Sequence, residues 1–436
     1  MEYFWLKTFR KQRKQQPGLA GCAPPWAGPM APSAIGRHDS LHFFRPVPAW
    51  ARGGRRSSLY AMPEGAIFRR TAAMTDLSAT THADALAGLD TPAVVIDAAK
   101  VEANLRRAQA YADRHGLRLR PHIKTHKMPH LALRQVELGA AGITCQKLGE
   151  AEVMADAGLA DIFLPYNIVG AAKLARLAAL KRRIAISVTA DNAVVVEGYA
   201  AAFADADAPL TVLVECDTGM GRCGVTTPEA ALALARTIAA APGLRFGGLM
   251  TFPATHRAVE ARDFLERSIA RLAAAGLPPA VVSSGGTPDL YAAGDDAGLV
   301  TEYRPGTYVF SDRFQVAKGV GGYDDCALGV LATVVSRPTD SRAVIDAGSK
   351  ALTSDLLGLD GYGYLPAYPE ARIASLSEEH GVIDFSASPR RPAIGERLFV
   401  IPNHVCPVVN LFDTVHFLHA GGSIEERRVA ARGRVG

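Results

Sequence analysis

From about Thr91, short runs of apolar and β-branched residues alternate with longer stretches in which Ala and Leu recur at helical spacing. The short runs predict eight strands, over residues 117–123, 142–146, 161–165, 183–188, 210–215, 245–250, 280–283 and 299–304. The longer stretches predict helices, among them residues 99–115, 171–180, 228–241 and 258–275. Strand and helix alternating over about 200 residues predict a parallel (β/α)8 barrel, the TIM-barrel arrangement.

A doubly wound open sheet is the alternative for such an alternation. It is disfavoured because no Gly-x-Gly-x-x-Gly follows the first strand, whereas glycine-rich segments follow the seventh and eighth, where barrels commonly bind phosphate. Beyond Gly319 the pattern changes to strands without intervening helices, over residues 327–335, 342–346, 381–385, 397–401 and 414–418. The prediction is an α/β protein with a TIM barrel over residues 74–318 and a mostly β domain over residues 319–436. An initial strand near residues 92–97 is a candidate member of the β domain.

Charge and cysteine content narrow the class of protein. The net charge of +5 comes from residues 1–73, which hold 12 Lys and Arg against 3 Asp and Glu and so leave 36 basic and 40 acidic residues elsewhere. The remainder is slightly acidic, which argues against a nucleic-acid partner. No apolar run is long enough for a signal peptide or a membrane helix, so no membrane partner is expected. Six scattered cysteines without a Cys-x-x-Cys pair exclude a disulfide framework and favour a cytoplasmic location.

The first 73 residues differ from the rest of the chain. They hold all three tryptophans and many prolines without a sustained hydrophobic period, which predicts a disordered segment. Met74 begins the tract Met74-Thr75-Asp76-Leu77, which is typical of an ordinary cytosolic start. We therefore expect residues 1–73 to be either disordered or a spurious extension.

Polar side chains at the ends of barrel strands face the active-site rim of such a fold. On an extended strand, His122 and Lys124 would share one face, and a desolvated lysine there suits Schiff-base chemistry. Small residues after the seventh strand would let backbone N–H groups wrap a phosphate, and a lysine and a phosphate site at one barrel mouth indicate pyridoxal 5'-phosphate (PLP). The alternative is a surface lysine beside an ordinary turn. The other polar or glycine positions at strand ends are Gln146, Tyr166, Asn167, Arg222, Ser284, Gly285, Gly286, Arg304, Gly306 and Tyr308.

A second candidate site lies in the β domain, in the segment Pro402-Asn403-His404-Val405-Cys406-Pro407. An extended backbone would place His404 and Cys406 on one face, where imidazole and thiolate could share a divalent ion. Two protein ligands leave coordination positions open, which suits a catalytic metal. The alternative is a packed histidine beside a buried cysteine.

Over about Thr91 to Ala420 the chain resembles the D-threonine aldolase and eukaryotic-type D-serine dehydratase family, an alanine-racemase-like group of PLP enzymes. The segments that carry the resemblance are Arg120 to Lys127 (RPHIKTHK), Asp217 to Gly224 (DTGMGRCG), Ser284 to Pro288 (SGGTP), Arg304 to Tyr308 (RPGTY) and Pro402 to Pro407 (PNHVCP).

The resemblance implies a role for each candidate residue. Lys124 would carry the cofactor and act in catalysis, and His404 and Cys406 would bind a divalent metal, with zinc favoured and manganese an option. Ser284, Gly285, Gly286 and Gly306 would contact the phosphate, while Arg222 and Arg304 compete for the pyridine nitrogen. The cofactor site would be completed by His122, Gln146, Tyr166, Asn167 and Tyr308.

The resemblance also implies a lyase for small D-β-hydroxy amino acids that works as a homodimer. The resemblance implies that dehydratase members carry His-x-Cys with zinc and that aldolase members tend to carry His-x-Asp with manganese-like ions, which agrees with the preference of thiolate for zinc. Since Cys406 stands at the second ligand position, a D-serine or D-threonine dehydratase that forms a 2-oxo acid and ammonia is favoured. A D-threonine aldolase that forms glycine and an aldehyde is the alternative. An amino-acid racemase, for which Tyr362 and Tyr364 match no motif, and a non-catalytic PLP-binding protein are further alternatives.

Overall fold

The computed structural model describes residues 83–255 and 257–436. The chain divides into two units, Met1–Arg69 and Arg70–Gly436, and all described residues belong to the second. The prediction for residues 1–73 therefore lies outside the described residues. Among the described helices, none combines the length and the apolar character that a membrane crossing requires.

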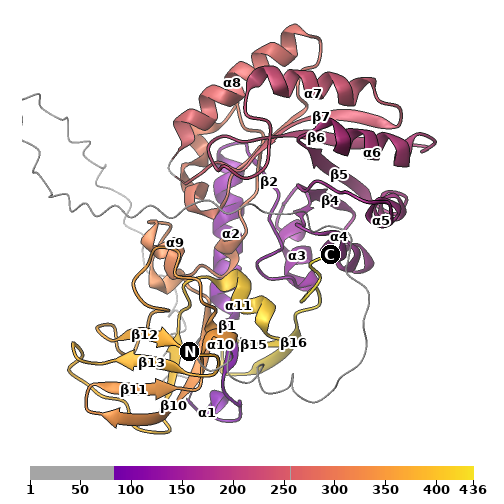
Figure 1. The fold of residues 1–436 in the computed structure, drawn as a ribbon. Helices are drawn as coiled ribbons and strands as arrows, with labels where there is room; N and C mark the ends of the chain where they lie inside the picture. Colours follow the sequence, from indigo (N-terminus) through magenta and orange to yellow (C-terminus); the bar gives the residue numbers. More distant parts are fainter. Residues whose placement is uncertain (1–82, 256) are drawn as a thin grey trace, which may run out of the picture. The chain divides into compact units, whose positions relative to one another are not determined.

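Eight parallel strands form the first sheet (Figure 1). They are β2 (Arg118–Leu119), β3 (Ile143–Thr144), β4 (Asp161–Leu164), β5 (Ala185–Ala190), β6 (Leu210–Cys216), β7 (Leu244–Thr251), β8 (Val281–Ser284) and β9 (Glu302–Tyr303). Their order is β2-β9-β8-β7-β6-β5-β4-β3. The two ends of the sheet meet, because Ile123 N–H donates to Thr144 O at 2.9 Å and Thr144 N–H donates to Pro121 O at 2.8 Å. The predicted (β/α)8 barrel is thereby confirmed.

Helices flank the barrel strands: α2 (Ala98–Arg114) precedes β2, and each of the others follows a strand. The others are α3 (Pro129–Glu137), α4 (Leu148–Asp156), α5 (Ala171–Lys181), α6 (Ala193–Phe203), α7 (Pro228–Ala240), α8 (Ala258–Ala274) and the 3-10 helix η2 (Thr287–Asp296). α7 begins with a side-chain cap, where the Thr227 hydroxyl accepts the Ala230 N–H at 3.1 Å, with Pro228 in the first turn. In Figure 1, α7 lies along β6 and β7, and α8 lies beside α7.

The second sheet is mostly antiparallel and forms the β domain. Its strands are β1 (Ala93–Asp97), β10 (Leu328–Thr339), β11 (Arg342–Ile345), β12 (Arg372–Leu376), β13 (Gly381–Asp384), β14 (Arg397–Val400), β15 (Thr414–Leu418) and β16 (Ile424–Arg428). The order is β12-β13-β11-β10-β1-β15-β16, and β14 also pairs with β10. β1 precedes the barrel in the chain yet lies between β10, to which it is antiparallel, and β15, to which it is parallel.

Short helical segments connect the rest of the chain. They are α1 (Ala83–Leu86), η3 (Thr307–Val309), α9 (Arg313–Ala317), η4 (Tyr323–Asp325), α10 (Ser349–Leu352) and α11 (Val405–Leu411). The last of these, α11, begins directly after His404 and carries Cys406 in its first turn. It places the second candidate site next to the barrel.

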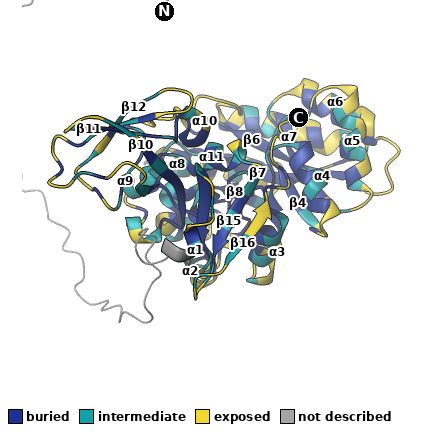
Figure 2. Ribbon diagram, turned by 90° about the horizontal axis from the view of Figure 1, so that it is seen from below, coloured by how far each residue is buried: buried dark blue, intermediate teal, exposed yellow. Residues whose placement is uncertain are grey.

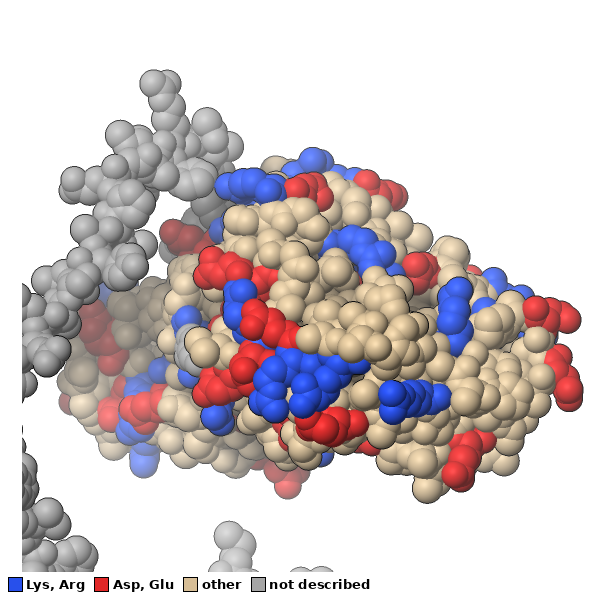
Figure 3. Space-filling view, turned by 90° about the horizontal axis from the view of Figure 1, so that it is seen from above, with Lys and Arg blue, Asp and Glu red and all other residues tan. Residues whose placement is uncertain are grey.

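The barrel and the β domain share one apolar core. A single cluster of buried side chains includes Val188 and Val214 of the barrel and Val334 and Ile345 of the β domain. Figure 2 shows most strands of both sheets as buried, whereas β16 and the outer faces of α5 and α6 are exposed. On the face in Figure 3, Lys and Arg side chains lie among Asp and Glu side chains.

Candidate active site

A cavity of about 330 Å³ lies where the loops after the barrel strands meet the start of α11. Its walls combine strand-end residues of the barrel with residues of the β domain. The sequence-predicted residues that line it are His122, Lys124, Gln146, Arg222, Gly285, Gly286, Arg304, Gly306, His404 and Cys406. The two candidate sites of the sequence therefore form one site.

Lys124 lies in a turn, and the expectation that it continues the first barrel strand is wrong. β2 ends at Leu119, and beyond Ile123 the chain folds back so that Lys127 N–H donates to Ile123 O at 2.7 Å. The alternation of side chains along a strand therefore does not reach Lys124. The turn nevertheless directs Lys124 into the same cavity as His122.

The surroundings of Lys124 favour a reactive amine. Burial is the main reason why the pKa of Lys124 lies below its usual value, and the nearby guanidinium groups of Arg222 and Arg304 lower it further. The charge of Cys406 acts in the opposite direction. A lowered pKa raises the fraction of neutral amine, which is the nucleophilic form.

His122 is buried and held by hydrogen bonds at both ring nitrogens. Its Nε2 lies 3.0 Å from Gln146 Oε1, and the Lys124 backbone N–H donates to its Nδ1 at 3.4 Å. Because Gln146 Oε1 can only accept, Nε2 carries the proton. Burial, together with the charge of Lys124, holds the pKa of His122 well below its usual value, so the ring is neutral.

A second buried histidine, His126, makes stability depend on pH. Burial lowers its pKa from 6.5 to about 3. The unfolded chain therefore binds a proton below pH 6.5 that the folded protein does not bind, and the free energy of unfolding falls as the pH falls through that window. We expect a loss of roughly 2 kcal/mol from this residue between pH 6.5 and 5.

Urea unfolding at a series of pH values would measure this loss. In His126→Gln the slope of stability against pH should become shallower, whereas His380→Gln, at an exposed position of the β domain, serves as the control. An unchanged slope in His126→Gln would assign the pH dependence to other groups.

Three glycines leave no space for a side chain at one end of the cavity. A Cβ at Gly285, where φ is +90°, would lie 2.1 Å from the Tyr303 ring, and a Cβ at Gly286 would lie 2.9 Å from Phe252. Gly306 is nearly as crowded, with Thr125 Oγ1 at 3.0 Å from its Cβ position. Such close backbone approach is typical of a phosphate cradle.

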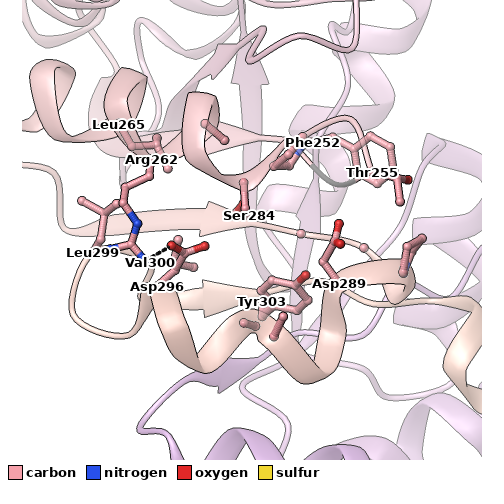
Figure 4. A pocket seen from close by; sticks show the side chains of 18 residues that line it. Phe252, Thr255, Arg262, Leu265, Ser284, Asp289, Asp296, Leu299, Val300 and Tyr303 are labelled. Carbon is pink, nitrogen blue, oxygen red and sulfur yellow. Dashed lines mark ion pairs between the residues drawn. The ribbon is translucent and has the colours of Figure 1, made fainter. Parts of the chain in front are cut away.

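The residues predicted to contact the phosphate differ in their hydrogen bonds and in the cavity that they line. Gly306 N–H already donates to Thr287 Oγ1 at 3.2 Å. Ser284 does not line the main cavity but faces a neighbouring one of about 70 Å³, together with Phe252 and Tyr303 (Figure 4). The Arg262–Asp296 ion pair lies in the wall of that smaller cavity.

The two candidate arginines are held differently. Arg304 is buried, donates from Nη1 to Ser283 Oγ at 2.6 Å and from Nη2 to Thr251 O at 2.8 Å. Ser283 in turn donates to Glu302 at 2.6 Å, so the guanidinium is fixed by a buried hydrogen-bonded chain. Burial lowers the pKa of Arg304 to about 10. Arg222 is exposed on the loop after β6, with its guanidinium carbon 5.3 Å from the Phe252 ring centre.

His404 and Cys406 meet in the cavity, but not along an extended segment as expected. His404 is the N-cap residue of α11, and Cys406 lies in the first helical turn. Burial opposes ionisation of Cys406, yet its hydrogen bond with His404 and the charges of His404 and Lys124 lower the pKa of the thiol below its usual value. Thr125 Oγ1 lies 3.1 Å from Cys406 Sγ, which connects the metal-ligand candidate to the turn of Lys124.

Asp355 is a site residue that the sequence pattern does not reveal. Its Oδ2 lies 2.8 Å from His404 Nδ1. Burial alone would lower the pKa of His404, but the hydrogen bonds with Cys406 and Asp355 raise it to about 9. With Nδ1 bound to the carboxylate, Nε2 is the ring nitrogen left to bind a metal.

Besides Ser284, three predicted residues do not line the cavity. Tyr166 lies with its ring centre 4.0 Å from Lys147 Nζ, and Asn167 donates to Asp191 Oδ1 at 2.8 Å. The hydroxyl of Tyr308 accepts from Gln135 Nε2 at 2.9 Å in the buried region behind α3. A position at a strand end does not by itself decide which way a side chain turns.

Comparison with known proteins agrees with this architecture. Residues 96–313 match the family model of the alanine racemase N-terminal domain, and residues 327–418 match the putative serine dehydratase domain. The fold is therefore that of the alanine-racemase-like, PLP-dependent enzymes.

The relatives define the class more narrowly. D-threonine aldolase of Arthrobacter sp is 39% identical over 364 residues, which cover 80% of this chain and 94% of that protein. D-threo-3-hydroxyaspartate dehydratase of Delftia sp. (strain HT23) is 34% identical over 378 residues, covering 78% and 97%. The crystal structure of D-threonine aldolase from Filomicrobium marinum has a TM-score of 0.75 at 35% identity and covers 80% of this chain and 98% of that one. The chain belongs to this family of PLP-dependent lyases.

Proposed function

We propose that the protein converts D-β-hydroxy amino acids, with D-serine and D-threonine as substrates, into a 2-oxo acid and ammonia. Lys124 carries PLP and accepts the proton from the substrate Cα. His404 and Cys406 hold a divalent metal, for which zinc is favoured. Every charged or thiol side chain that lines the cavity would then bind the cofactor, the metal or the substrate.

The cavity fits PLP. Lys124 supplies the amine for a covalent bond, and Gly285 and Gly286, which line the cavity without side chains, would present their backbone to a phosphate. Arg304, already fixed by Ser283, is the better held of the two arginines and is assigned to the pyridine nitrogen. The bound cofactor withdraws electrons from the bonds at Cα, although an arginine at its nitrogen discourages ring protonation and weakens this effect.

The donor set fits a catalytic zinc ion. Imidazole and thiolate are ligands that zinc prefers over manganese, and two protein ligands leave positions for the substrate. A bound ion would act as a Lewis acid on the β-hydroxyl group. Structures exist of D-threo-3-hydroxyaspartate dehydratase mutants of a histidine and of a cysteine two residues apart, and that of the cysteine mutant is of the metal-free form. His404 and Cys406 have the same spacing.

The observation that carries the proposal is the set of proton acceptors in the cavity, because elimination and cleavage need different ones. Among the described residues, no Asp or Glu lines the cavity, and both nitrogens of His122 are engaged. Elimination of water needs an acceptor for the proton on Cα, and we assign Lys124 Nζ to this role. Cleavage of the Cα–Cβ bond needs an acceptor for the hydroxyl proton, and with Lys124 assigned to Cα the described cavity residues offer no carboxylate for that step.

Aldol cleavage is the second candidate because D-threonine aldolases are 39% and 35% identical to this chain. Incubation of the protein, reconstituted with PLP and zinc or manganese, with D-threonine separates the two reactions. We expect 2-oxobutyrate and ammonia. Glycine and acetaldehyde as the main products would establish cleavage instead, and the absence of either pair would contradict both proposals.

Asp355 provides a further test of the metal site. Asp355→Asn should weaken zinc binding by roughly 10- to 100-fold, because the amide fixes the His404 tautomer less well than the carboxylate. Competition with a chelator measures the affinity. Asp360→Asn is the matched control, because Asp360 lies in the same loop but pairs with Arg372 at 3.0 Å on the surface. Equal affinities in the two variants would remove Asp355 from the metal site.

We also propose that the protein is a homodimer in which a second copy covers the mouth of the cavity. Met220, Leu356 and Leu357 support this, because these apolar side chains are 45%, 40% and 40% exposed at or beside the cavity. Sedimentation equilibrium is expected to give twice the mass of the chain. A monomer at micromolar concentration would contradict the proposal.

We also propose that the protein is cytoplasmic. The described cysteines, Cys145, Cys216, Cys223, Cys326 and Cys406, are all free thiols, which a reducing compartment preserves. Fractionation of source cells with an antibody against the protein would test the location. Enrichment in a membrane or extracellular fraction would contradict it.

A further inference from the structure

We propose that Leu357 determines which β-substituents the enzyme accepts, so that alkyl and aryl groups are favoured and a β-carboxylate is rejected. This inference rests on the function proposed above, because it requires the β-hydroxyl to be bound near His404 and Cys406. It adds a specificity residue and a substrate class to that site.

Leu357 lies at the metal end of the cavity. It lines the cavity together with His404 and Cys406, and it follows Asp355, which is hydrogen-bonded to His404, by two residues. Asn403 fixes the backbone on both sides of Leu357, because its Nδ2 donates to Asp355 O at 3.1 Å and to Gly361 O at 2.9 Å. The Leu357 side chain is therefore held in the part of the cavity wall near His404, where the proposed function puts Cβ of the substrate.

The backbone of Leu357 is in a conformation that leucine rarely adopts. Its φ is +50°, in the left-handed region, where a residue other than glycine costs about 1 kcal/mol. Gly358, the next residue, also has a positive φ, of +78°, and there the chain has glycine, the residue type that this conformation favours. The leucine side chain is 40% exposed and lines the cavity. An unfavourable backbone at a partly exposed residue of the cavity wall indicates that the side chain serves the site.

The charges around Leu357 oppose a second carboxylate. Asp355 lies against His404, and the buried Asp312 accepts the Val405 N–H at 3.1 Å, so two carboxylates already flank the start of α11. Phe314 adds an apolar wall on the same side of the cavity. A β-carboxylate here would lose hydration beside groups of its own sign.

The cations of the cavity are committed elsewhere. Arg304 is bound to Ser283 and Thr251, and Lys124 is assigned to the cofactor. Arg222 lies over Phe252, whose ring is 2.9 Å from the Cβ position of Gly286, and so belongs to the phosphate end. Apart from His404 and the metal that it is proposed to hold for the β-hydroxyl, no described residue that lines the cavity offers a free positive charge to a carboxylate beside Leu357.

The test measures kcat/KM of the PLP- and zinc-loaded enzyme for D-threonine and for threo-3-hydroxy-D-aspartate. Each value is divided by kcat/KM for D-serine, whose Cβ carries no substituent other than the hydroxyl group. The wild type should favour D-threonine. Leu357→Arg should raise the normalised value for the β-carboxylate substrate by about tenfold or more, because it supplies the missing charge. Ile394→Arg is the control, since Ile394 is an exposed apolar residue of the β domain that does not line the cavity.

Leu357→Gly adds a readout that is independent of activity. The free energy of unfolding in urea should stay the same or rise, because the backbone strain is relieved, while the normalised value for D-threonine falls about tenfold. A wild-type preference for the β-carboxylate substrate, or equal effects of Leu357→Arg and Ile394→Arg, would overturn the inference and leave the proposed function intact. No turnover of any of the three substrates would overturn the proposed function itself.

Discussion

Lys124→Ala should abolish both turnover and the visible absorbance of the covalently bound cofactor. Lys124 is the only lysine among the described residues that line the cavity, and it serves as both the attachment point and the proton acceptor. Loss of a general base alone lowers a rate by roughly 10²- to 10⁴-fold, and loss of the covalent bond adds to this. We therefore expect a decrease of roughly 10³-fold or more in kcat with D-threonine.

The control for this prediction is Lys173→Ala, at a partly buried position of α5 outside the cavity. It should keep both the absorbance and the rate. Absorbance spectra of the purified variants, followed by product assays at saturating PLP, give both readouts. If Lys124→Ala retained full turnover, the assignment of the cofactor and the base to this residue would be wrong.

The barrel could be predicted from the sequence because its strands are buried and short while its helices are amphipathic and long. The same reasoning misses strands at the edges of the second sheet. β12 and β16 are the terminal strands of that sheet, and the exposed Glu and Arg side chains of β16 leave no apolar run to detect. β1 is a buried apolar run, but its neighbours β10 and β15 lie more than two hundred residues further along the chain, so its pairing has no local signal.

The candidate site shows the same limit at the level of single side chains. Lys124 and the glycines could be found because their residue types are rare at strand ends and have specific chemistry. Asp355 could not, because its contact with His404 joins two segments separated by 49 positions, and nothing around it distinguishes it from a surface aspartate. Tyr166 and Tyr308 share the strand-end position of the cavity residues, but their side chains pack against Lys147 and Gln135.

The arrangement of the two domains explains why one active site needs both. The turn of Lys124 contacts α11 through Thr125 and Cys406, and Arg313 of α9 donates its backbone N–H to Pro402 O at 3.1 Å. β1 connects the start of the barrel to the middle of the second sheet. The position of the thiol relative to the lysine is thus set by the packing of the whole unit rather than by a flexible tether.

Cys406→Ala should remove the metal and with it the elimination reaction. Thiolate is the softer of the two proposed ligands, and an imidazole alone holds zinc weakly, so zinc affinity should fall by roughly 100-fold or more. The rate with D-threonine should fall by a similar factor, because the β-hydroxyl is a poor leaving group without a Lewis acid. Chelation of the wild-type enzyme should have the same effect, and added zinc should reverse it.

Two further variants show whether the thiol acts as a ligand. Cys406→Asp replaces the soft donor by a carboxylate, and it should restore activity with manganese more than with zinc. Cys223→Ala removes an exposed thiol on the loop after β6 and should change neither metal content nor rate. Metal analysis of the purified proteins, together with rates in zinc and manganese, separates these outcomes. A full complement of zinc in Cys406→Ala, or a wild-type rate that chelators do not change, would contradict the role of this cysteine.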